Sequence, residues 1–169
     1  LENGRLNSSP RVRLSKHVAN HKLLAKGDIL LVGSSGAAKN VGRAGFLKEE
    51  PTNPLTFASF TVRLRGKPET VLQEFAFCLI QSPWVEFALF CKRAADGKYN
   101  LQLRQLQAAL VPLLPLPEQR AIADTLGSVD RKIEVEERRK VTLEALFKTL
   151  VDHLMTGRVR VASLEARNA

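Results

Sequence analysis

The stretch that most constrains the fold runs from Pro112 to Gly157. Nothing in the 39 residues from Glu118 to Thr156 forces a break, so they predict a single helix of roughly 58 Å. Pro117 suits the first helical turn because its missing N–H would have no partner there, and Glu118 favours the positive end of the helix dipole. Gly157 is typical of the C-terminal stop. The sequence therefore predicts one long α-helix near its C-terminal end.

Apolar residues recur along this helix with a seven-residue period. Eight of the ten a and d positions are apolar over about five heptads, which favours a coiled-coil seam over a one-sided surface helix. The two exceptions, Glu136 and Lys140, sit together near the middle. The predicted seam, or coiled-coil interface, consists of Ile122, Leu126, Val129, Ile133, Glu136, Lys140, Leu143, Phe147, Leu150 and Leu154.

The seam complements itself when the helix is folded antiparallel onto a copy of itself about Arg138. Positions whose numbers add to 276 then face each other, so that each apolar residue meets an apolar one and Glu136 meets Lys140. We therefore expect antiparallel pairing, in which residue 122 lies near residue 154 of the partner. The alternative is that Glu136 and Lys140 form an i,i+4 pair within one helix and that the seam packs on this chain's own globular part.

The positive charge is concentrated before the helix. Residues 1–116 hold 16 Lys or Arg and 8 Asp or Glu, whereas residues 117–169 hold 10 and 9, within a formal net charge of +9. The near-neutral helix suits assembly, and the basic globular part suits a polyanionic partner, most simply nucleic acid. The alternative is a basic surface that serves solubility alone.

The compartment follows from what the sequence lacks. No run of 18 apolar residues predicts a transmembrane helix, and the first residues are too polar for a signal peptide. Cys78 and Cys91 lie in apolar segments and are expected to be free thiols in a reducing cytoplasm. Because the sequence starts at Leu1 within polar sequence, we expect an upstream portion to be missing.

Strands and helices both precede the long helix, so the predicted fold class is α+β. Buried or half-buried strands are expected at Ile29–Val32, at residues 41–46 and at residues 57–65, the last with a basic face. Helices are expected from Val71 to about Gln81 with Thr70 as its cap, from Ser82–Pro83 through Cys91, and over residues 101–108.

Two polar, basic loops are the candidate DNA-binding elements, at residues 34–43 and 92–100. Their hydroxyl, amide, ammonium and guanidinium groups are the kinds that contact DNA phosphates and base edges, Arg toward guanine and Asn toward adenine. The candidate residues are Ser34, Ser35, Lys39, Asn40, Arg43, Lys92, Arg93, Lys98, Tyr99 and Asn100.

Catalytic patterns are not found in the sequence. The three histidines show no ligand spacing with the cysteines, so no metal site is expected. Neither a carboxylate cluster nor a nucleophile motif appears, and the glycine- and serine-rich loop after Val32 lacks the ending of a P-loop. We therefore expect a binding and assembly module with no catalytic residues.

Four segments together resemble the specificity subunit of type I restriction-modification systems. They are KGDIL at 26–30, VGRA at 41–44, PLPEQRAIA at 115–123 and LMTGRVRV at 154–161, so the resemblance extends over residues 23–161. The segments at the start and at the end of the long helix are specific for this family only when both are present.

The resemblance implies a small mixed α/β target recognition domain over residues 1–111, truncated at its N-terminus, and a conserved spacer over residues 112–169. Within the spacer the helix covers about residues 117–157 and forms an antiparallel coiled coil. In the family a full subunit carries two such units, and each reads one half of a bipartite double-stranded DNA site. This sequence has one recognition domain, so it is either half of a tandem subunit or a half-length subunit that dimerises.

The resemblance also implies partners and a source. The specificity subunit is non-catalytic and places modification (methyltransferase) subunits and restriction (translocase and nuclease) subunits on DNA, in the cytoplasm of a bacterium or archaeon. No cofactor is expected on this chain, because S-adenosylmethionine and ATP would belong to the partner subunits.

Two other functions are compatible with a basic head and a coiled coil. A dimeric DNA-binding regulator would carry a helix-turn-helix reading head, against which the predicted strands argue. A coiled-coil adaptor without DNA readout would show little DNA affinity at low salt.

Overall fold

The computed structural model of this chain describes residues 19–83, 85–86 and 90–160. The chain divides into two compact units, residues 1–123 and residues 124–169. The first unit holds all the strands and the shorter helices, and the second holds most of the long helix. Each unit is considered by itself.

The first sheet is built around the apolar run that the sequence places in a buried strand. Strand β1 (Ile29–Val32) lies between β3 (Ala44–Phe46) and β4 (Thr61–Leu64), and both neighbours are antiparallel to it. Consecutive side chains of a strand point to opposite faces, and Ile29, Leu30 and Leu31 are all buried. The prediction of a buried strand here is therefore confirmed.

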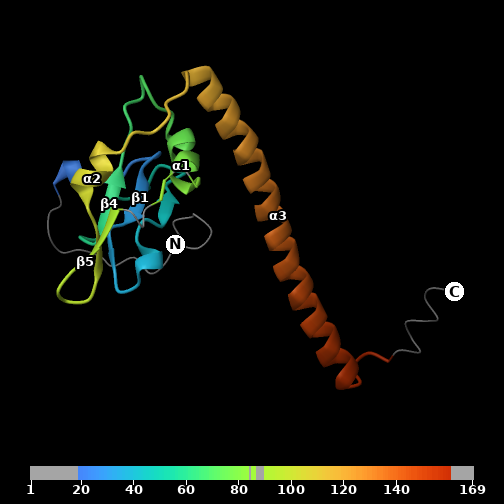
Figure 1. Ribbon diagram of the computed structural model, residues 1–169. Coiled ribbons are helices and arrows are strands. Elements are labelled where there is room, and N and C mark those ends of the chain that lie inside the picture. The colour runs from blue at the N-terminus through green and yellow to red at the C-terminus, as the bar shows by residue number, and fades with distance from the viewer. Residues whose placement is uncertain (1–18, 84, 87–89, 161–169) are drawn as a thin grey trace. The chain divides into compact units, whose positions relative to one another are not determined.

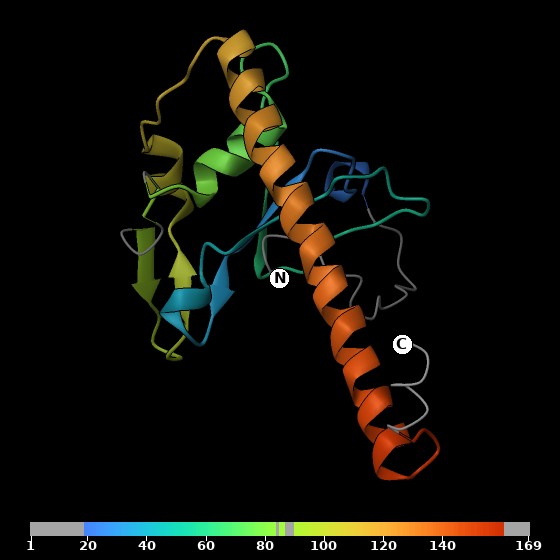
Figure 2. The same ribbon diagram turned by 90° about the vertical axis from the view of Figure 1, so that its right-hand side faces the viewer.

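A second sheet begins where β1 ends. Strand β2 (Ser34–Ser35) follows β1 after Gly33 and pairs antiparallel with β6 (Tyr99–Leu101), which pairs antiparallel with β5 (Cys91–Arg93). Figure 2 shows β5 and β6 as neighbouring arrows joined by a short turn. One extended segment thus contributes to both sheets.

The core lies between the strands and helix α1 (Gln73–Gln81). Phe77 of this helix stacks on Phe46 of β3, with ring centroids 5.3 Å apart. Short elements complete the unit, namely α2 (Leu103–Ala108) and the 3-10 turns η1 (Asn20–Lys22) and η2 (Ala38–Asn40). The buried core residues are Ile29, Leu31, Val41, Phe46, Phe77 and Leu101.

Several local expectations for this unit are wrong. The strands expected at residues 41–46 and 57–65 are shorter, and the helix expected over residues 101–108 begins at Leu103, because Leu101 belongs to β6. Thr70 does not cap α1, whose N-cap residue is Leu72, because the Thr70 hydroxyl instead donates to the carbonyl of Lys67 at 3.2 Å. The helix expected from Ser82–Pro83 through Cys91 does not reach its end, since Cys91 belongs to strand β5. Residues 84 and 87–89 of that segment lie outside the described residues.

The predicted long helix is confirmed. Helix α3 (Leu116–Met155) has 40 residues and is drawn in orange to red in Figure 1 as an unbroken ribbon. Its first two turns belong to the first unit, where Gln119 and Ala123 are its buried residues. Among the described residues, no helix is long and apolar enough to cross a membrane.

Candidate nucleic-acid interface

The pairing of β2 with β6 brings the two candidate loops together. Ser34 lies opposite Asn100, and Ser35 lies opposite Tyr99, although more than 60 residues separate the partners in sequence. On the other side of β6, Lys92 lies opposite Asn100 and Arg93 opposite Tyr99. Six of the ten candidate residues therefore belong to one three-stranded sheet.

These six residues fall on two faces of that sheet. Residues directly opposite each other in an antiparallel pair project to the same face, and consecutive residues of a strand project to opposite faces. Tyr99 and Leu101 pack on the hydrophobic core, so their face is the inner one. Asn100 therefore projects from the outer face, in one row with Ser34 and Lys92. We call Ser34, Asn100 and Lys92 the outer row.

The inner face uses its polar groups within the protein. The Arg93 guanidinium lies over the Tyr99 ring, 5.9 Å from its centroid, and the ring also packs against the core. The Ser35 hydroxyl oxygen accepts hydrogen bonds from the Ala37 N–H at 3.3 Å and from the Asn40 side-chain amide at 3.5 Å. These contacts occupy the Ser35 and Tyr99 side chains, and Arg93 is exposed. In the outer row Lys92 is exposed, and Ser34 and Asn100 are half-buried.

A tight turn joins β5 to β6 and holds Lys98. Gly97 adopts a φ of 83°, which favours glycine, and its N–H donates to the Ala94 carbonyl at 3.0 Å. The Lys98 ammonium lies 3.3 Å from the Asp96 carboxylate, and both side chains are exposed. The Lys98 backbone N–H donates to the same carboxylate, and this hydrogen bond lowers the pKa of Asp96.

The remaining candidates follow β2. Lys39 is exposed in η2, and Arg43 is exposed just before β3. Gly42 between them has a φ of 82° and its N–H donates to the Val32 carbonyl at 2.8 Å, which returns the chain to the first sheet. Residues 33–43 and 91–101 together carry five Lys or Arg and one Asp, so the second sheet and its connections are strongly basic.

The basic face expected on residues 57–65 is used for folding. Arg65 donates to both carboxylate oxygens of Asp28, at 2.6 and 2.7 Å, and this contact raises the pKa of Arg65. Arg63 donates to the Leu23 carbonyl at 2.8 Å and lies over the Phe57 ring. Because Asp28 is fully buried, its bidentate pair with Arg65 ties β4 to the start of β1.

The described residues contain no group of three His, Cys, Asp or Glu placed to hold a metal ion. Cys78 and Cys91 do not form a disulfide, and burial raises the pKa of Cys91. A raised pKa keeps this thiol protonated and lowers its reactivity, so Cys91 acts as a small apolar core residue.

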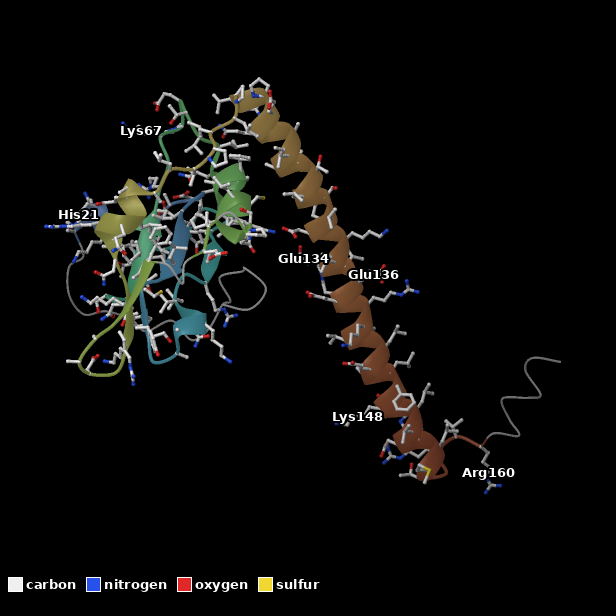
Figure 3. The ribbon with its side chains drawn as sticks, in the orientation of Figure 1. His21, Lys67, Glu134, Glu136, Lys148 and Arg160 are labelled. Atoms are coloured by element: carbon white, nitrogen blue, oxygen red, sulfur yellow. The ribbon has the colours of Figure 1, made fainter. Side chains whose placement is uncertain are left out.

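The seam residues lie along α3. Its eight apolar members are between 36% exposed, at Ile122, and 70% exposed, at Phe147. Within the helix, Glu136 pairs with Arg139 at 3.8 Å and Lys140 pairs with Glu144 at 3.8 Å. The two polar seam residues therefore pair with other residues and not with each other. Figure 3 shows Glu136 and Lys148 projecting from the ribbon of α3.

Gln119 is a residue for which sequence reasoning found no role. Its side chain is fully buried in the first turn of α3 and hydrogen-bonds to backbone atoms of Thr70, Leu72 and Leu114. The heptad pattern starts at Ile122 and does not include it. The available signal was its place in the segment PLPEQRAIA, where a polar residue follows the helix start.

Comparison with known proteins identifies the family. A profile of the type I restriction modification DNA specificity domain matches residues 3–145. The chain belongs to this family. This specificity domain is 28% identical over 142 residues to the MjaVIII type I restriction enzyme specificity subunit of Methanocaldococcus jannaschii, which is 84% of this chain and 33% of that protein.

A second similar protein of the same organism is named as the specificity subunit of the type I restriction enzyme MjaX. It is 38% identical over 58 residues, which cover 34% of this chain and 14% of that protein. The specificity domain thus spans about a third or less of the length of the curated relatives that it matches. Membership of the family favours the specificity-subunit interpretation over a dimeric regulator or an adaptor.

Proposed function

We propose that this chain is the DNA sequence-specificity component of a type I restriction-modification enzyme. It recognises one half of a bipartite target, has no catalytic activity of its own, and places modification and restriction subunits on the DNA. The S-adenosylmethionine and ATP that these reactions need would bind to those partner subunits.

The observation that carries the proposal is the second sheet, β2-β6-β5. It collects polar and basic side chains from two distant segments and orders three of them in the outer row. The major groove of DNA admits a two-stranded β-ribbon, and an Asn side chain can pair with an adenine through two hydrogen bonds. Asn100 is the outer-row member suited to reading a base, while Lys92 suits a phosphate.

Flanking charges would add affinity without sequence preference. Lys39 and Lys98 are exposed in the connections next to β2 and β6, and Arg43 is exposed just before β3. Each phosphate that such a residue neutralises releases counterions, so binding should weaken steeply with salt.

Helix α3 would join two recognition units. Its seam offers exposed apolar residues over about five heptads, and its antiparallel self-complementarity suits either a second copy of the chain or the helix of another recognition half. Two units held this way would read the two halves of the target.

The test is co-expression of the chain with its modification subunits, followed by mapping of adenine methylation. We expect a bipartite motif, palindromic for a dimer of half-length subunits and asymmetric for a tandem partner. Substitution Asn100→Ala should relax one base position of the motif, because a bidentate base contact contributes about 1–3 kcal/mol of discrimination. The exposed Asn53, substituted to Ala, is the matched control and should leave the motif unchanged. The absence of any methylated motif with the unsubstituted chain would contradict the proposal.

A further inference from the structure

The start of α3 is hydrogen-bonded to the rest of the first unit by the Gln119 side chain. Gln119 is fully buried, and its Nε2 donates to the carbonyl oxygens of Thr70 at 3.0 Å and Leu114 at 2.7 Å. Its Oε1 accepts the N–H of Leu72 at 2.8 Å. We call these three hydrogen bonds the Gln119 latch.

The chemistry of the partners fixes the orientation of this amide. Two carbonyl oxygens face the NH₂ group, and one N–H faces the amide oxygen. A flipped amide would place oxygen against oxygen at two contacts and NH₂ against N–H at the third. Both amide hydrogens are used. A buried side chain with all its donors paired has one low-energy position, and removing it would take away the side-chain partner of three backbone groups in a partly buried site.

The latch also completes the start of α1. Leu72 is the N-cap residue of α1, and no side chain of α1 caps this end. The first N–H groups of a helix lack partners within it, and the Gln119 oxygen receives one hydrogen bond at this end. The loop before it is tight, since the Thr70 and Val71 N–H groups both donate to the Lys67 carbonyl at 3.0 Å. The latch therefore joins the beginnings of two helices through an ordered loop.

Beyond the latch, the buried residues of α3 soon end. Ala123, one turn later, is 8% exposed, and it is the last residue of α3 that is buried. A helix of 40 residues is about 60 Å long, so a tilt of about 3° at its start moves its far end by about 3 Å. That displacement is close to the rise of about 3.4 Å for one base pair. A small change of orientation at the latch thus shifts a unit carried at the far end of α3, across the helix axis, by a distance of the order of one base pair.

We infer that Gln119 is a positioning residue that sets the spacer length accepted between the two half-sites. It holds the first turn of the spacer helix to the recognition domain, and it touches neither DNA nor the reacting groups. The inference rests on the proposed function, and it assigns a role to the glutamine of the segment PLPEQRAIA.

The experiment measures methylation by the complex of the full chain with its modification subunits. The substrates carry the two half-sites separated by the normal spacer or by one base pair more or less. With Gln119→Met, which keeps the length of the side chain and removes all three hydrogen bonds, we expect the preference for the normal spacer to fall at least tenfold while both half-site sequences stay the same. Gln119→Glu, which keeps the acceptor and loses both donors, should behave in the same way.

Two controls separate positioning from loss of stability. Ile29→Val removes a buried methylene from the core, away from the latch, and should leave spacer preference unchanged despite a lower melting temperature. Gln107→Met makes the same chemical change at an exposed position of α2 and should change neither property.

A second measurement does not depend on DNA. Amide hydrogen exchange at Leu72 should become at least tenfold faster in Gln119→Met, while exchange at Leu31 in the core should stay the same. Unchanged exchange at Leu72, unchanged spacer preference in Gln119→Met, or equal relaxation in Ile29→Val would each overturn the inference. A lack of any bipartite motif with the unsubstituted chain would overturn the proposed function, and the inference with it.

Discussion

At the scale of single residues, charge in this chain serves two different ends. In the sequence, Asp28 and Arg65 resemble the other charged residues near turns. In the structure they form a bidentate pair whose carboxylate is fully buried. The Ala25 N–H also donates to Asp28, at 2.9 Å. Lys98 and Asp96, by contrast, form an exposed pair in a turn. Burial, and not residue type, decides which pair supports the fold.

Substitution Asp28→Asn should lower the free energy of unfolding by about 2 kcal/mol, because the charge-assisted hydrogen bonds to Arg65 are lost. The loss stays below that of a fully buried ion pair, since the Arg65 side chain is 46% exposed and water can hydrate it. Urea denaturation at pH 7 measures the change.

Asp96→Asn is the control for that experiment and should leave the stability nearly unchanged, because its pair with Lys98 is exposed. The pKa of Asp96 is lowered in the folded protein, so any contribution of its turn is present above pH 3.8 and is lost as the pH falls below that value. Equal urea midpoints for Asp28→Asn and Asp96→Asn at pH 7 would show that the buried pair is not structural.

At the scale of elements, the passage from β1 to β2 positions the candidate interface. The Gly33 N–H donates to the Phe60 carbonyl at 2.8 Å, and the Gly33 carbonyl accepts the Leu101 N–H at 2.8 Å. Gly33 therefore bonds to the first sheet on one side and to the second sheet on the other. Position 33 has no room for a side chain, because a Cβ would lie 2.9 Å from the Val62 Cγ2 atom and 3.1 Å from the Phe60 carbonyl oxygen.

Gly33→Ala should destabilise the domain by about 2 kcal/mol, since the added methyl group forces a neighbouring strand to move. It should also weaken DNA binding by displacing β2 from β6. Gly36→Ala is the matched control, because nothing lies within 4 Å of a Cβ at that position. Thermal unfolding measures the stability, and DNA titration measures the binding. A Gly33→Ala protein as stable as the Gly36→Ala protein would disprove the steric conflict at Gly33.

At the scale of the whole molecule, α3 has apolar residues that stay exposed along its length. Between Leu126 and Leu154 every apolar residue of the seam is at least 38% exposed. In proteins, helices gain most of their stability from the packing of an apolar face. The seam is therefore expected to be covered by a second helix in the working assembly.

Glu136→Lys should weaken self-association of the chain. Antiparallel pairing about Arg138 puts residue 136 opposite residue 140 twice in a dimer, so this substitution creates two Lys–Lys contacts. We expect a loss of about 1–2 kcal/mol, equivalent to roughly tenfold in Kd. Analytical ultracentrifugation of the purified chain measures it.

The double variant Glu136→Lys with Lys140→Glu should restore the dimer, because the opposite charges meet again. Asp124→Lys makes the same change of charge on the helix, outside the a and d positions, and should have little effect. A dimer that tolerates Glu136→Lys, or that the double variant fails to restore, would contradict antiparallel pairing.

Local pattern was sufficient for the longest elements. The uninterrupted heptads between the prolines and Gly157 determined α3 to within two residues at each end, and the apolar run Ile29–Val32 determined β1. Both follow from periodicity and from turn residues, which act over a few positions along the chain. The choice of the two polar loops as candidates likewise needed only residue types, although their contact with DNA stays a prediction.

The tertiary structure decided what depends on contacts between distant segments. Cys91–Arg93 resembles the end of an apolar helix, but it forms β5 because β6 offers an edge for pairing. The pairing of β2 with β6 placed Asn100 between Ser34 and Lys92, and packing of α3 on the loop before α1 buried Gln119. None of these is encoded by local periodicity, because burial and strand pairing are fixed by where the rest of the chain closes around a residue.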